Sequence, residues 1–546
     1  MVEGRGGIVP VVTAMETVAR RIIEAYKASP SMGHSGLAKL KYRASSEAGL
    51  SRVPRNHEII RYLRQGEEWM ISVLRGKGVR SASGIYTVAV MTKPCRCPKE
   101  EPCSYCPGGP GEGTPQSYLG NEPALMRGVQ TGFDPYLQVK CRLGQYSAIG
   151  HRPSKVQLII MGGTFPATDL DYQEWFVCRC LQAMNDYPLE VAHARCDLED
   201  AQRRNDSSRV RCIGLTMETR PDWAGKAQID RMLGLGATLV ETGVQALDDG
   251  ILAGVNRGHG TSDVVEATRG LRDSGLKVGY HMMPGLPGSD PSRDLADLKR
   301  IFEDPGFRPD YLKIYPTLVI GGTALHRLWR EGKYTALSTE RAARIICEAH
   351  RFFPRWVRVA RIQRDVPADI IAAGVKKSNL REIVDAMMAE EGIRCSCIRC
   401  REVGLSAIRG GKGETGRVTL SREAYEAGGG TEEFLSFNSS VGDLLVGFLR
   451  LRIPSPNAHR AEVRGAAVVR ELHIYGPQVA VGEKGGDGFQ HKGFGARLLA
   501  EGERIAREEY GLKRIAVLPG VGVRGYYRAK GYRKAPSSPF LVKGLA

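Results

Sequence analysis

Four cysteines lie close together in a segment that is rich in proline and glycine. The string KPCRCPKEEPCSYCPGGPG holds Cys95, Cys97, Cys103 and Cys106. An iron–sulfur cluster needs several converging thiolates, and short turns bring their sulfur atoms together at a small entropic cost. Four closely spaced cysteines suit a tetrahedral zinc ion equally well. The string alone therefore predicts a metal centre in a loop and leaves both interpretations open.

A second group of candidate metal ligands lies further along the chain. The string IRCSCIRCREVG holds Cys395, Cys397 and Cys400, and Cys347 with His350 forms an upstream pair on a predicted helix. This spacing is typical of zinc ligands, and a small segment with little core gains folding free energy from a bound metal. The favoured set is Cys347, His350, Cys397 and Cys400, because Cys395 and Cys397 cannot easily both point inward from an extended segment. The alternative is that these thiols are reduced and bind nothing.

Between the two cysteine groups, short apolar runs alternate with stretches of helical period. The runs are VQLIIMGGTF, RCIGLTMETRP, ATLVETGVQ and LKVGYHMMPGLPG, and repeated strand and helix units predict a parallel sheet. Ligands of such sheets bind at the carboxyl ends of the strands, where this chain places Gly162, Gly163, Glu218 and Arg220. A salt bridge at a strand end is the alternative role for Glu218 or Arg220.

The C-terminal part of the chain returns to strands with one long helix, GFGARLLAEGERIAREEYG. The preceding residues QHK complete the string QHKGFG, so the free N–H groups at the start of this helix predict an anion site. Gly493 and Gly495 would allow a pyrophosphate to approach without a Cβ in the way.

The composition indicates a globular protein with an anionic partner. The chain has 546 residues, 42% hydrophobic and 25% charged, with a net charge of +18 and a pI near 9.4. Residues 1–80 contain 14 Lys and Arg against 7 Asp and Glu, a net charge of +7, and carry the helical pattern VTAMETVARRIIEAYKA. Clustered cations gain affinity by releasing counterions from phosphates, so we expect an N-terminal helical segment that binds nucleic acid. A role of the surplus arginine in solubility alone is the other interpretation.

Targeting signals and cysteine usage predict a cytoplasmic protein. The N-terminus lacks the pattern of a signal peptide, and no stretch approaches the roughly 18 apolar residues of a membrane span. In a reducing compartment the 13 cysteines do not form a disulfide framework, which again favours metal ligation by the two groups.

A three-cysteine loop that opens a strand-and-helix barrel is similar to the radical S-adenosylmethionine superfamily. This resemblance implies that Cys97, Cys103 and Cys106 hold a 4Fe–4S cluster, while Cys95 is spare. The open iron would chelate S-adenosylmethionine, whose cleavage yields a 5′-deoxyadenosyl radical. Further strings, CPGGPGEGTPQSYLGNEPALMRG, MGGTFPA, METRPD, ETGVQALDD and KIYPTLVIGGT, resemble the catalytic subunit of Elongator over most of the chain. The short cysteine spacing looks prokaryotic or archaeal, and Glu218 and Arg220 would lie near the ribose and carboxylate of the cofactor.

The pattern Gln-x-x-Gly-x-Gly, with the strand VVRELHIYG before it, resembles the acetyl-CoA motif of the GNAT acetyltransferases. The string VRGYYRAKGY resembles the segment whose tyrosine lies near the thioester sulfur, which makes Tyr527, beside Tyr526, a candidate proton donor. Rings that pack in the core are the alternative. The resemblance also implies acetyl-CoA contacts from Lys155, Glu471, Leu472, His473, Ile474, Phe489, Gln490, His491, Gly493 and Gly495.

We therefore expect an α/β protein in which a radical SAM partial (β/α) barrel is followed by a GNAT α/β domain. The expected boundaries are a small basic helical N-terminal domain at 1–80, the radical SAM domain at 81–345, a connecting segment at 346–415 and the GNAT domain at 416–546. The resemblance implies that the enzyme forms 5-carboxymethyluridine at the wobble position of tRNA. The target uridine must be unstacked to reach the pocket, which the single-stranded bases of the anticodon loop allow. A protein lysine acetyltransferase with a structural cluster and a tRNA-binding scaffold with vestigial sites are the rivals. A homodimer or Elongator-like partner subunits are both compatible with the sequence.

Overall fold

The computed structural model describes residues 14–74, 82–408, 416–479 and 489–545. The described residues form two compact units. One unit holds residues 14–74 together with 142–153, and the other holds the remaining residues. Among the residues described, no helix is both long and apolar enough to cross a membrane.

The first unit contains a small helical core. Its helices are α1 (Ala14–Ala28), α2 (Gly33–Glu47), α3 (Asn56–Ile60) and α4 (Met70–Leu74). Helix α1 buries Val18, Ile22 and Tyr26 at helical spacing, so one face meets the core while the other stays polar. The short helices α3 and α4 complete that core through Ile59 and Leu74. The expected basic helical segment is present in the described part of residues 1–80.

The second unit begins with a seven-stranded sheet in which every neighbouring pair is parallel and the strand order is β1-β2-β3-β4-β5-β6-β8. Such a sheet is buried on both faces, which explains the continuous apolar runs of its strands. Its strands are β1 (Tyr86–Met91), β2 (Lys155–Met161), β3 (Arg211–Thr219), β4 (Leu239–Gln245), β5 (Lys277–Met282), β6 (Tyr311–Ile314) and β8 (Arg358–Arg361). The last strand, β8, therefore lies within residues 346–415, which were expected to form a connecting segment.

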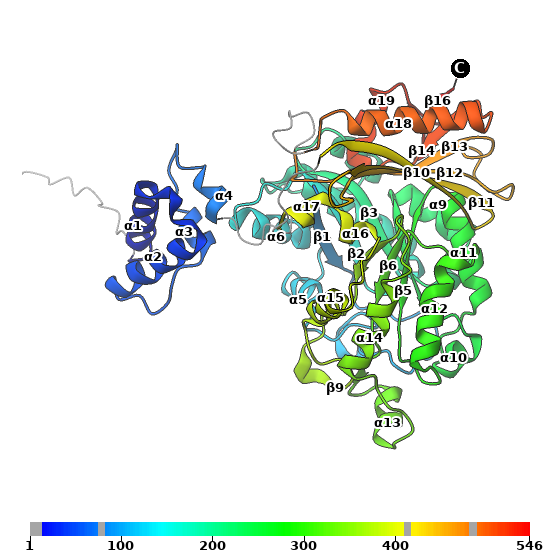
Figure 1. The fold of residues 1–546 in the computed structure, drawn as a ribbon, viewed down its shortest axis with the longest axis horizontal. Coiled ribbons are helices and arrows are strands. Elements are labelled where there is room, and N and C mark those ends of the chain that lie inside the picture. Colours follow the sequence, from blue (N-terminus) through cyan, green and yellow to red (C-terminus); the bar gives the residue numbers. More distant parts are fainter. Residues whose placement is uncertain (1–13, 75–81, 409–415, 480–488, 546) are drawn as a thin grey trace, which may run out of the picture. The chain divides into compact units, whose positions relative to one another are not determined.

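Helices follow most of these strands, and Figure 1 shows α11 and α12 along the outer side of the sheet. Aspartate side chains cap several of them, since Asp169, Asp248 and Asp290 accept hydrogen bonds from the first free N–H groups. The helices are α5 (Pro123–Gln130), α6 (Pro135–Ala148), α7 (Leu170–Asp186), α8 (Leu198–Asn205), α9 (Lys226–Leu235), α10 (Asp249–Gly254), α11 (Thr261–Asp273), α12 (Pro291–Glu303), α13 (Ala324–Arg330), α14 (Thr339–Ala349), α15 (Leu380–Glu390), α16 (Ile398–Arg401) and α17 (Val403–Ile408). The expected partial (β/α) barrel is confirmed.

A second seven-stranded sheet lies in the C-terminal part of the unit. Its strand order is β10-β11-β12-β13-β14-β16-β15, and β13 and β14 run parallel while the other neighbours run antiparallel. The elements are β10 (Val418–Ala427), β11 (Gly430–Ser439), β12 (Leu445–Ile453), β13 (Ala467–Ile474), α18 (Phe494–Arg504), β14 (Arg514–Val517), α19 (Arg524–Arg528), β15 (Arg533–Lys534) and β16 (Leu541–Gly544). The C-terminal α/β domain expected from the sequence is thus present.

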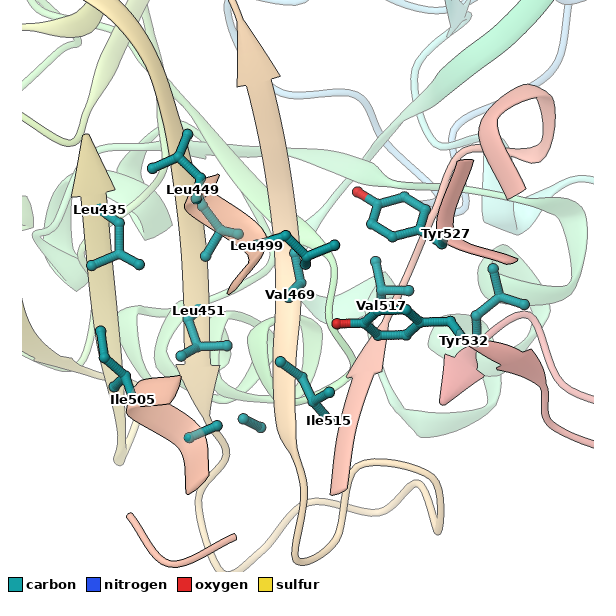
Figure 2. Packing of buried hydrophobic residues seen from close by; sticks show 14 of the residues in the cluster. Leu435, Leu449, Leu451, Val469, Leu499, Ile505, Ile515, Val517, Tyr527 and Tyr532 are labelled. Carbon is teal, nitrogen blue, oxygen red and sulfur yellow. The ribbon is translucent and has the colours of Figure 1, made fainter. Parts of the chain in front are cut away.

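The two faces of this second sheet have opposite chemistry because side chains alternate along a strand. One face is apolar: Leu449 and Leu451 of β12 pack with Val469 of β13 and Leu499 of α18 (Figure 2). Arg450 and Arg452, which alternate with those leucines, lie on the other face and are fully buried.

The charged face meets the amino-terminal ends of the barrel strands. Arg470 of β13 donates to both carboxylate oxygens of Asp310 at 2.8 Å and to Glu432 at 2.7 Å. Arg452 donates to Asp273 at 2.6 Å, and Asp310 immediately precedes β6. Removing one partner from a buried ion pair costs about 3–5 kcal/mol, because the other charge is left unpaired. This network therefore fixes one orientation of the C-terminal sheet on the barrel.

Candidate functional site

The first cysteine loop begins directly after β1, at the carboxyl edge of the parallel sheet. Cys103 is buried and Cys97 and Cys106 are half-buried. The backbone N–H of Cys106 donates to the carbonyl of Cys103 at 2.9 Å, which makes a tight turn between the two sulfur-bearing residues. Although burial raises the pKa of a thiol, Arg257 and Lys99 bring that of Cys103 below its usual value. The structure thus brings Cys103 and Cys106 together, with the cations beside Cys103, while burial raises the pKa of Cys106 to about 11.

Cys95 has different surroundings from the other three cysteines. The aromatic residue beside it is Tyr172 of α7, whose pKa is raised mainly by burial and further by Cys95. Tyr172 also accepts a hydrogen bond from the backbone of Lys93 at 3.0 Å. This placement is compatible with the expectation that Cys95 is not a ligand.

Several buried polar atoms near the cysteine loop have no hydrogen-bond partner among the described residues. They are the Oη of Tyr105, Nη1 of Arg220, Oε1 of Gln245, Nε of Arg257 and both ring nitrogen atoms of His259. Burial, with a smaller effect of Arg257, lowers the pKa of His259 to about 3, so its ring is neutral. An unpaired buried polar group costs about 1–3 kcal/mol, and five such residues around one loop fit a polar cofactor that pairs with them.

The glycines expected at the carboxyl edge lie immediately after β2. Gly162 and Gly163 have φ values of +139° and +89°, a region that disfavours other residues. A Cβ on Gly162 would lie 1.9 Å from the Oγ1 of Thr92, which follows β1. Because Met91 and Met161 are paired across β1 and β2, this glycine turn and the cysteine loop leave the same edge of the sheet.

Glu218 and Arg220 stand at the end of β3, as the sequence predicted. Glu218 accepts a hydrogen bond from the hydroxyl of Tyr118 at 2.8 Å. Arg220 forms a two-pronged ion pair with Asp222, at 2.9 and 2.6 Å, which is the alternative role considered for it. Its remaining Nη1 is nevertheless buried and unpaired within the described part of the chain, so the ion pair leaves one donor for a ligand.

A polar row across the barrel strands was missed by sequence reasoning. Glu241 of β4 contacts the ammonium of Lys313 on β6 and lies 3.3 Å from the Nε2 of His281 on β5. Burial alone would raise the pKa of Glu241, but Lys313 and His281 lower it to about 2. Glu218 stands opposite Glu241 in the register of β3 and β4. The pairing of these residues depends on strand order, which the strings themselves do not reveal.

The glycine loop of the C-terminal domain lies at the other edge of the first sheet. Gly493 caps α18 with a φ of +86°, so its left-handed backbone lets the chain turn into the helix. Gln490 accepts from the Nζ of Lys155 at 3.1 Å and donates to the carbonyl of Ile474 at 3.0 Å. The Nζ of Lys155 also lies 3.3 Å from the Nε2 of His491. Lys155 is therefore brought to this loop, as expected.

The side chains of β13 divide between two faces. Glu471 accepts from Tyr311 at 2.7 Å and from Arg450 at 2.9 Å, and His473 lies 2.9 Å from the carbonyl of Ser83. Leu472 and Ile474 instead pack against the apolar core of the C-terminal sheet, as does Phe489 of the loop before α18. The side chains of Glu471 and His473 are thus occupied by contacts within the protein, which leaves the backbone of this strand to meet a cofactor.

The two candidate tyrosines have unequal environments. Tyr527 is part of the apolar core beside Val517 and Tyr532 (Figure 2), and burial raises its pKa well above the usual value. Tyr526 is 36% exposed, and its hydroxyl lies 3.3 Å from the position that a Cβ on Gly495 would take. Tyr526 is therefore the tyrosine whose hydroxyl is next to the glycine loop.

The second cysteine group gathers around His350 at the end of α14. The ligand atoms of His350, Cys395 and Cys400 all lie within 4.8 Å of one another. Hydrogen bonds with the thiols of Cys395 and Cys400 lower the pKa of the buried Cys397. Burial lowers the pKa of His350 to about 4, so its ring is neutral, and its Nε2 is unpaired among the described residues. These are the properties of a zinc ligand set.

This set differs from the one that the sequence favoured. Cys395 belongs to the group of ligand atoms, whereas Cys347 and Cys397 do not, although the Cys397 thiol is hydrogen bonded with those of Cys395 and Cys400. The argument against Cys395 assumed an extended segment, but Cys397 caps α16 and its N–H donates to the Cys395 sulfur at 3.4 Å. The structure therefore brings Cys395 to His350 and Cys400, which makes Cys395 a further candidate ligand.

Comparisons with known families match most of the chain. Residues 94–299 match the model of the radical SAM superfamily, residues 309–390 match the radical SAM C-terminal domain, and residues 11–82 match the ELP3 N-terminal domain. The solved structure of archaeal Methanocaldococcus infernus Elp3 with an N-terminal deletion covers 85% of this chain and 100% of its own, at 44% identity and a TM-score of 0.73.

Curated relatives extend over nearly the full length. The "tRNA uridine(34) acetyltransferase" of Methanocaldococcus jannaschii is 46% identical over 528 residues, covering 95% of this chain and 96% of the relative. The protein of the same name from Dehalococcoides mccartyi is 48% identical, covering 83% and 96%. "Elongator complex protein 3" of Homo sapiens is 40% identical, covering 99% of both chains. With a cysteine loop, a parallel half-barrel and this coverage in common, the chain belongs to the family of Elongator complex protein 3 and the tRNA uridine(34) acetyltransferases.

Proposed function

We propose that this protein modifies uridine 34, the wobble base of tRNA, and that the product is 5-carboxymethyluridine. The observation that carries the proposal is the presence of two cofactor-type sites at the two ends of one strand. Strand β2 starts at Lys155, beside the glycine loop of α18, and leads into Gly162 and Gly163 beside the cysteine loop. Relatives named for acetyl transfer at tRNA uridine 34 support the same reading.

We assign the cysteine loop to a 4Fe–4S cluster and S-adenosylmethionine, with Cys97, Cys103 and Cys106 as the iron ligands. When bound, these groups supply radical chemistry at the methyl group of acetyl-CoA. The buried unpaired nitrogen atoms of Arg220 and His259 would pair with polar groups of the cofactor. Gly162 and Gly163 would let the protein backbone approach the cofactor closely.

The overall reaction balances with S-adenosylmethionine and water as further reactants. Joining the acetyl methyl carbon to C5 of the uracil ring removes two hydrogens and two electrons. S-adenosylmethionine would be the oxidant: its cleavage to methionine and 5′-deoxyadenosine takes up the hydrogen of the methyl group, while the hydrogen of C5 is released as a proton. Hydrolysis of the thioester then releases coenzyme A and leaves a carboxymethyl group on the base. A buried barrel interior protects such a reaction from solvent, and the polar row of Glu241, His281 and Lys313 supplies groups that can hold or move a proton there.

We assign the acetyl-CoA site to the loop before α18. The free N–H groups of this helix would bind the pyrophosphate, with Gly493 and Gly495 allowing close approach. Lys155 would contact the bound coenzyme, since its ammonium already lies against Gln490 and His491. Tyr526, whose hydroxyl faces Gly495, is the better candidate than the buried Tyr527 for donating a proton to the departing thiolate.

We assign RNA binding to the basic helical unit. On α2, the exposed side chains include Lys39, Tyr42 and Arg43, and Tyr42 is 69% exposed. Cations attract the phosphate backbone, while an exposed aromatic ring is a stacking platform for an unpaired base. We expect the protein to act on tRNA in the cytoplasm, and relatives named as an Elongator complex protein support partner subunits.

We further propose a structural zinc ion held by His350, Cys395, Cys397 and Cys400. The four side chains come from the end of α14 and the start of α16, so a metal would tie two helices of the connecting segment together. Tetrahedral coordination by one neutral histidine and three thiolates is a common structural zinc site.

Labelled acetyl-CoA tests the proposed reaction against its main rival. Full-length protein would be reconstituted anaerobically with iron and sulfide, then incubated with tRNA and acetyl-CoA radiolabelled in the methyl group. Label in tRNA only when both S-adenosylmethionine and a reductant are present supports the proposal. Label on protein lysines, independent of S-adenosylmethionine, would instead identify a lysine acetyltransferase with a structural cluster.

A further inference from the structure

One buried arginine lies against a cluster-type cysteine without any carboxylate beside it. Arg257 follows α10 and is 7% exposed. Its Nη1 donates to the sulfur of Cys103 at 3.7 Å, and its Nη2 donates to the carbonyl of Gly243 at 2.5 Å. Among the described residues, Arg257 forms no ion pair with Asp or Glu, and its Nε is buried without a partner.

The turn that carries Arg257 is built onto the cysteine loop. The N–H of Ser104 donates to the carbonyl of Val255 at 3.0 Å, and Nδ2 of Asn256 donates to the carbonyl of Pro102 at 3.2 Å. Asn256 and Gly258 both have positive φ values, +54° and +76°. These residue types adopt the left-handed region readily, and the two hydrogen bonds to the cysteine loop hold the turn, and with it Arg257, beside that loop.

A second cation reaches the same sulfur from the other side of the turn. The ammonium of Lys99 contacts the carbonyl of Asn256 and lies 4.0 Å from the Cys103 sulfur. A Cβ on Gly258 would lie 3.0 Å from the Cε of Lys99. The glycine thus leaves room for the lysine stem, and two cationic side chains converge on one sulfur atom.

Gly243 shows that the barrel also makes room for the guanidinium. It lies within β4, where glycine packs poorly and usually marks a close approach by another group. A Cβ at this position would lie 2.6 Å from the Nη2 of Arg257. An alanine there would push the guanidinium away from its place between Gly243 and Cys103.

A buried cation without an anion is costly, which indicates that the anion is a ligand of this site. The sulfur of Cys103 becomes negative when it binds iron, and it is the acceptor nearest to the charge apart from a neutral carbonyl. We propose that Arg257 is a positioning residue that holds the Cys103 thiolate and stabilises the reduced form of the cluster. This inference rests on the proposed cluster at Cys97, Cys103 and Cys106.

The step that Arg257 favours is the addition of one electron. A low-potential reductant gives one electron to the cluster, its core passes from a charge of 2+ to 1+, and no bond forms or breaks. The site gains one negative charge, so a nearby cation attracts the reduced form more strongly than the oxidised form. Hydrogen bonds and charges at the sulfur ligands are established determinants of cluster potentials.

Potentiometric titration followed by electron paramagnetic resonance tests this role without using activity. Full-length wild type, Arg257→Met and Arg257→Lys would be reconstituted anaerobically and titrated in the absence of tRNA. We expect Arg257→Met to shift the one-electron reduction equilibrium at least tenfold toward the oxidised cluster, which is 59 mV. Arg257→Lys retains the charge, so its midpoint potential should lie close to that of the wild type. Arg231→Met, on α9 and away from the cysteine loop, is the matched control and should leave the potential unchanged.

Two further variants keep the inference falsifiable when Arg257→Met binds too little iron. Gly243→Ala displaces the guanidinium and Lys99→Met removes the second cation, and each should shift the equilibrium in the same direction. Unchanged midpoints in iron-loaded Arg257→Met, or in both other variants, would overturn the inference and leave the proposed function standing. A wild-type protein that forms no iron–sulfur cluster would overturn the proposed radical site itself.

Discussion

The Nζ of Lys155 lies 3.1 Å from the Oε1 of Gln490, so the first residue of β2 reaches the glycine loop of the C-terminal domain. The other end of β2 leads to Gly162 and the cysteine loop. A strand of seven residues spans about 20 Å between its first and last Cα atoms. The acetyl unit of a coenzyme bound near Lys155 must therefore cross the length of the barrel strand to meet a radical formed at the carboxyl edge.

Affinity for acetyl-CoA should depend on the charge of Lys155. Burial, with a smaller effect of Arg211, lowers the pKa of Lys155 to about 8, so its ammonium is charged below that pH and neutral above it. We expect binding of the anionic coenzyme to weaken as the pH rises from 7 to 9. Lys155→Met should bind roughly tenfold more weakly at pH 7, because hydrogen bonds to charged groups are worth about 1.5–3 kcal/mol. Isothermal titration calorimetry measures both effects.

The exposed Lys226 offers a matched control for that experiment, and Lys226→Met should keep the wild-type pH dependence. An affinity that stays constant between pH 7 and 9 in the wild-type protein would remove Lys155 from the acetyl-CoA site.

The four cysteines of the first loop should respond differently to replacement. Cys97→Ala, Cys103→Ala and Cys106→Ala should each lose the brown chromophore and the cleavage of S-adenosylmethionine after anaerobic reconstitution, because each removes one iron ligand. Cys95→Ala should keep both, since Cys95 lies beside Tyr172 instead. Absorption spectra and iron content report the result, and loss of the cluster in Cys95→Ala alone would refute the ligand assignment.

Binding of tRNA should depend steeply on salt and on the basic face of α2. Each phosphate contact contributes roughly 0.7–0.9 to the slope of log affinity against log salt. Replacing Lys39 and Arg43 by Gln should therefore weaken binding and lower the slope by roughly 1.5. Deleting residues 1–75 should weaken tRNA binding further while acetyl-CoA affinity stays the same. Lys299→Gln on α12 is the control in filter-binding measurements, and full tRNA affinity in the deletion variant would refute this role.

Zinc content should follow the proposed ligand set of His350, Cys395, Cys397 and Cys400. About one zinc per chain is expected after iron is stripped, and Cys395→Ser or Cys400→Ser should lose it and lower the unfolding midpoint by at least about 5 °C. Cys347→Ser should retain zinc, because its sulfur is outside the group around His350. Elemental analysis with thermal unfolding decides the matter. Zinc-free wild-type protein, or full zinc content in Cys400→Ser, would show that these cysteines do not bind zinc.

The parts of the fold that could be predicted are those whose signal is local. The apolar runs that became β2 and β3 are followed by Gly162 and Arg220, and Gly493 caps the helix that became α18, so these elements and their ligand edges could be placed from short strings. The approach of Cys395 to His350 and Cys400 depends on a turn before α16 and was not predicted. Local strings give periodicity, and they do not specify the dihedral angles of a turn.

The contacts of two buried arginines with distant parts of the chain were not predicted. Arg257 lies 154 residues from Cys103, and Arg470 lies 160 residues from Asp310. Each pairing depends on strand order and on which face a strand presents, which a single sequence does not reveal. The burial of Tyr527, which occupies the motif position, beside the exposed Tyr526 has the same cause, because only packing separates the two rings.

Nucleoside mass spectrometry of tRNA tests the central claim most directly. Reconstituted full-length protein would be incubated anaerobically with S-adenosylmethionine, a reductant, acetyl-CoA and a tRNA that carries uridine at position 34, beside a matched tRNA with cytidine there. The account predicts 5-carboxymethyluridine in the first tRNA, no modified nucleoside in the second, and no product when either cofactor is omitted. Unmodified uridine 34 in the presence of a loaded cluster and both cofactors would contradict it.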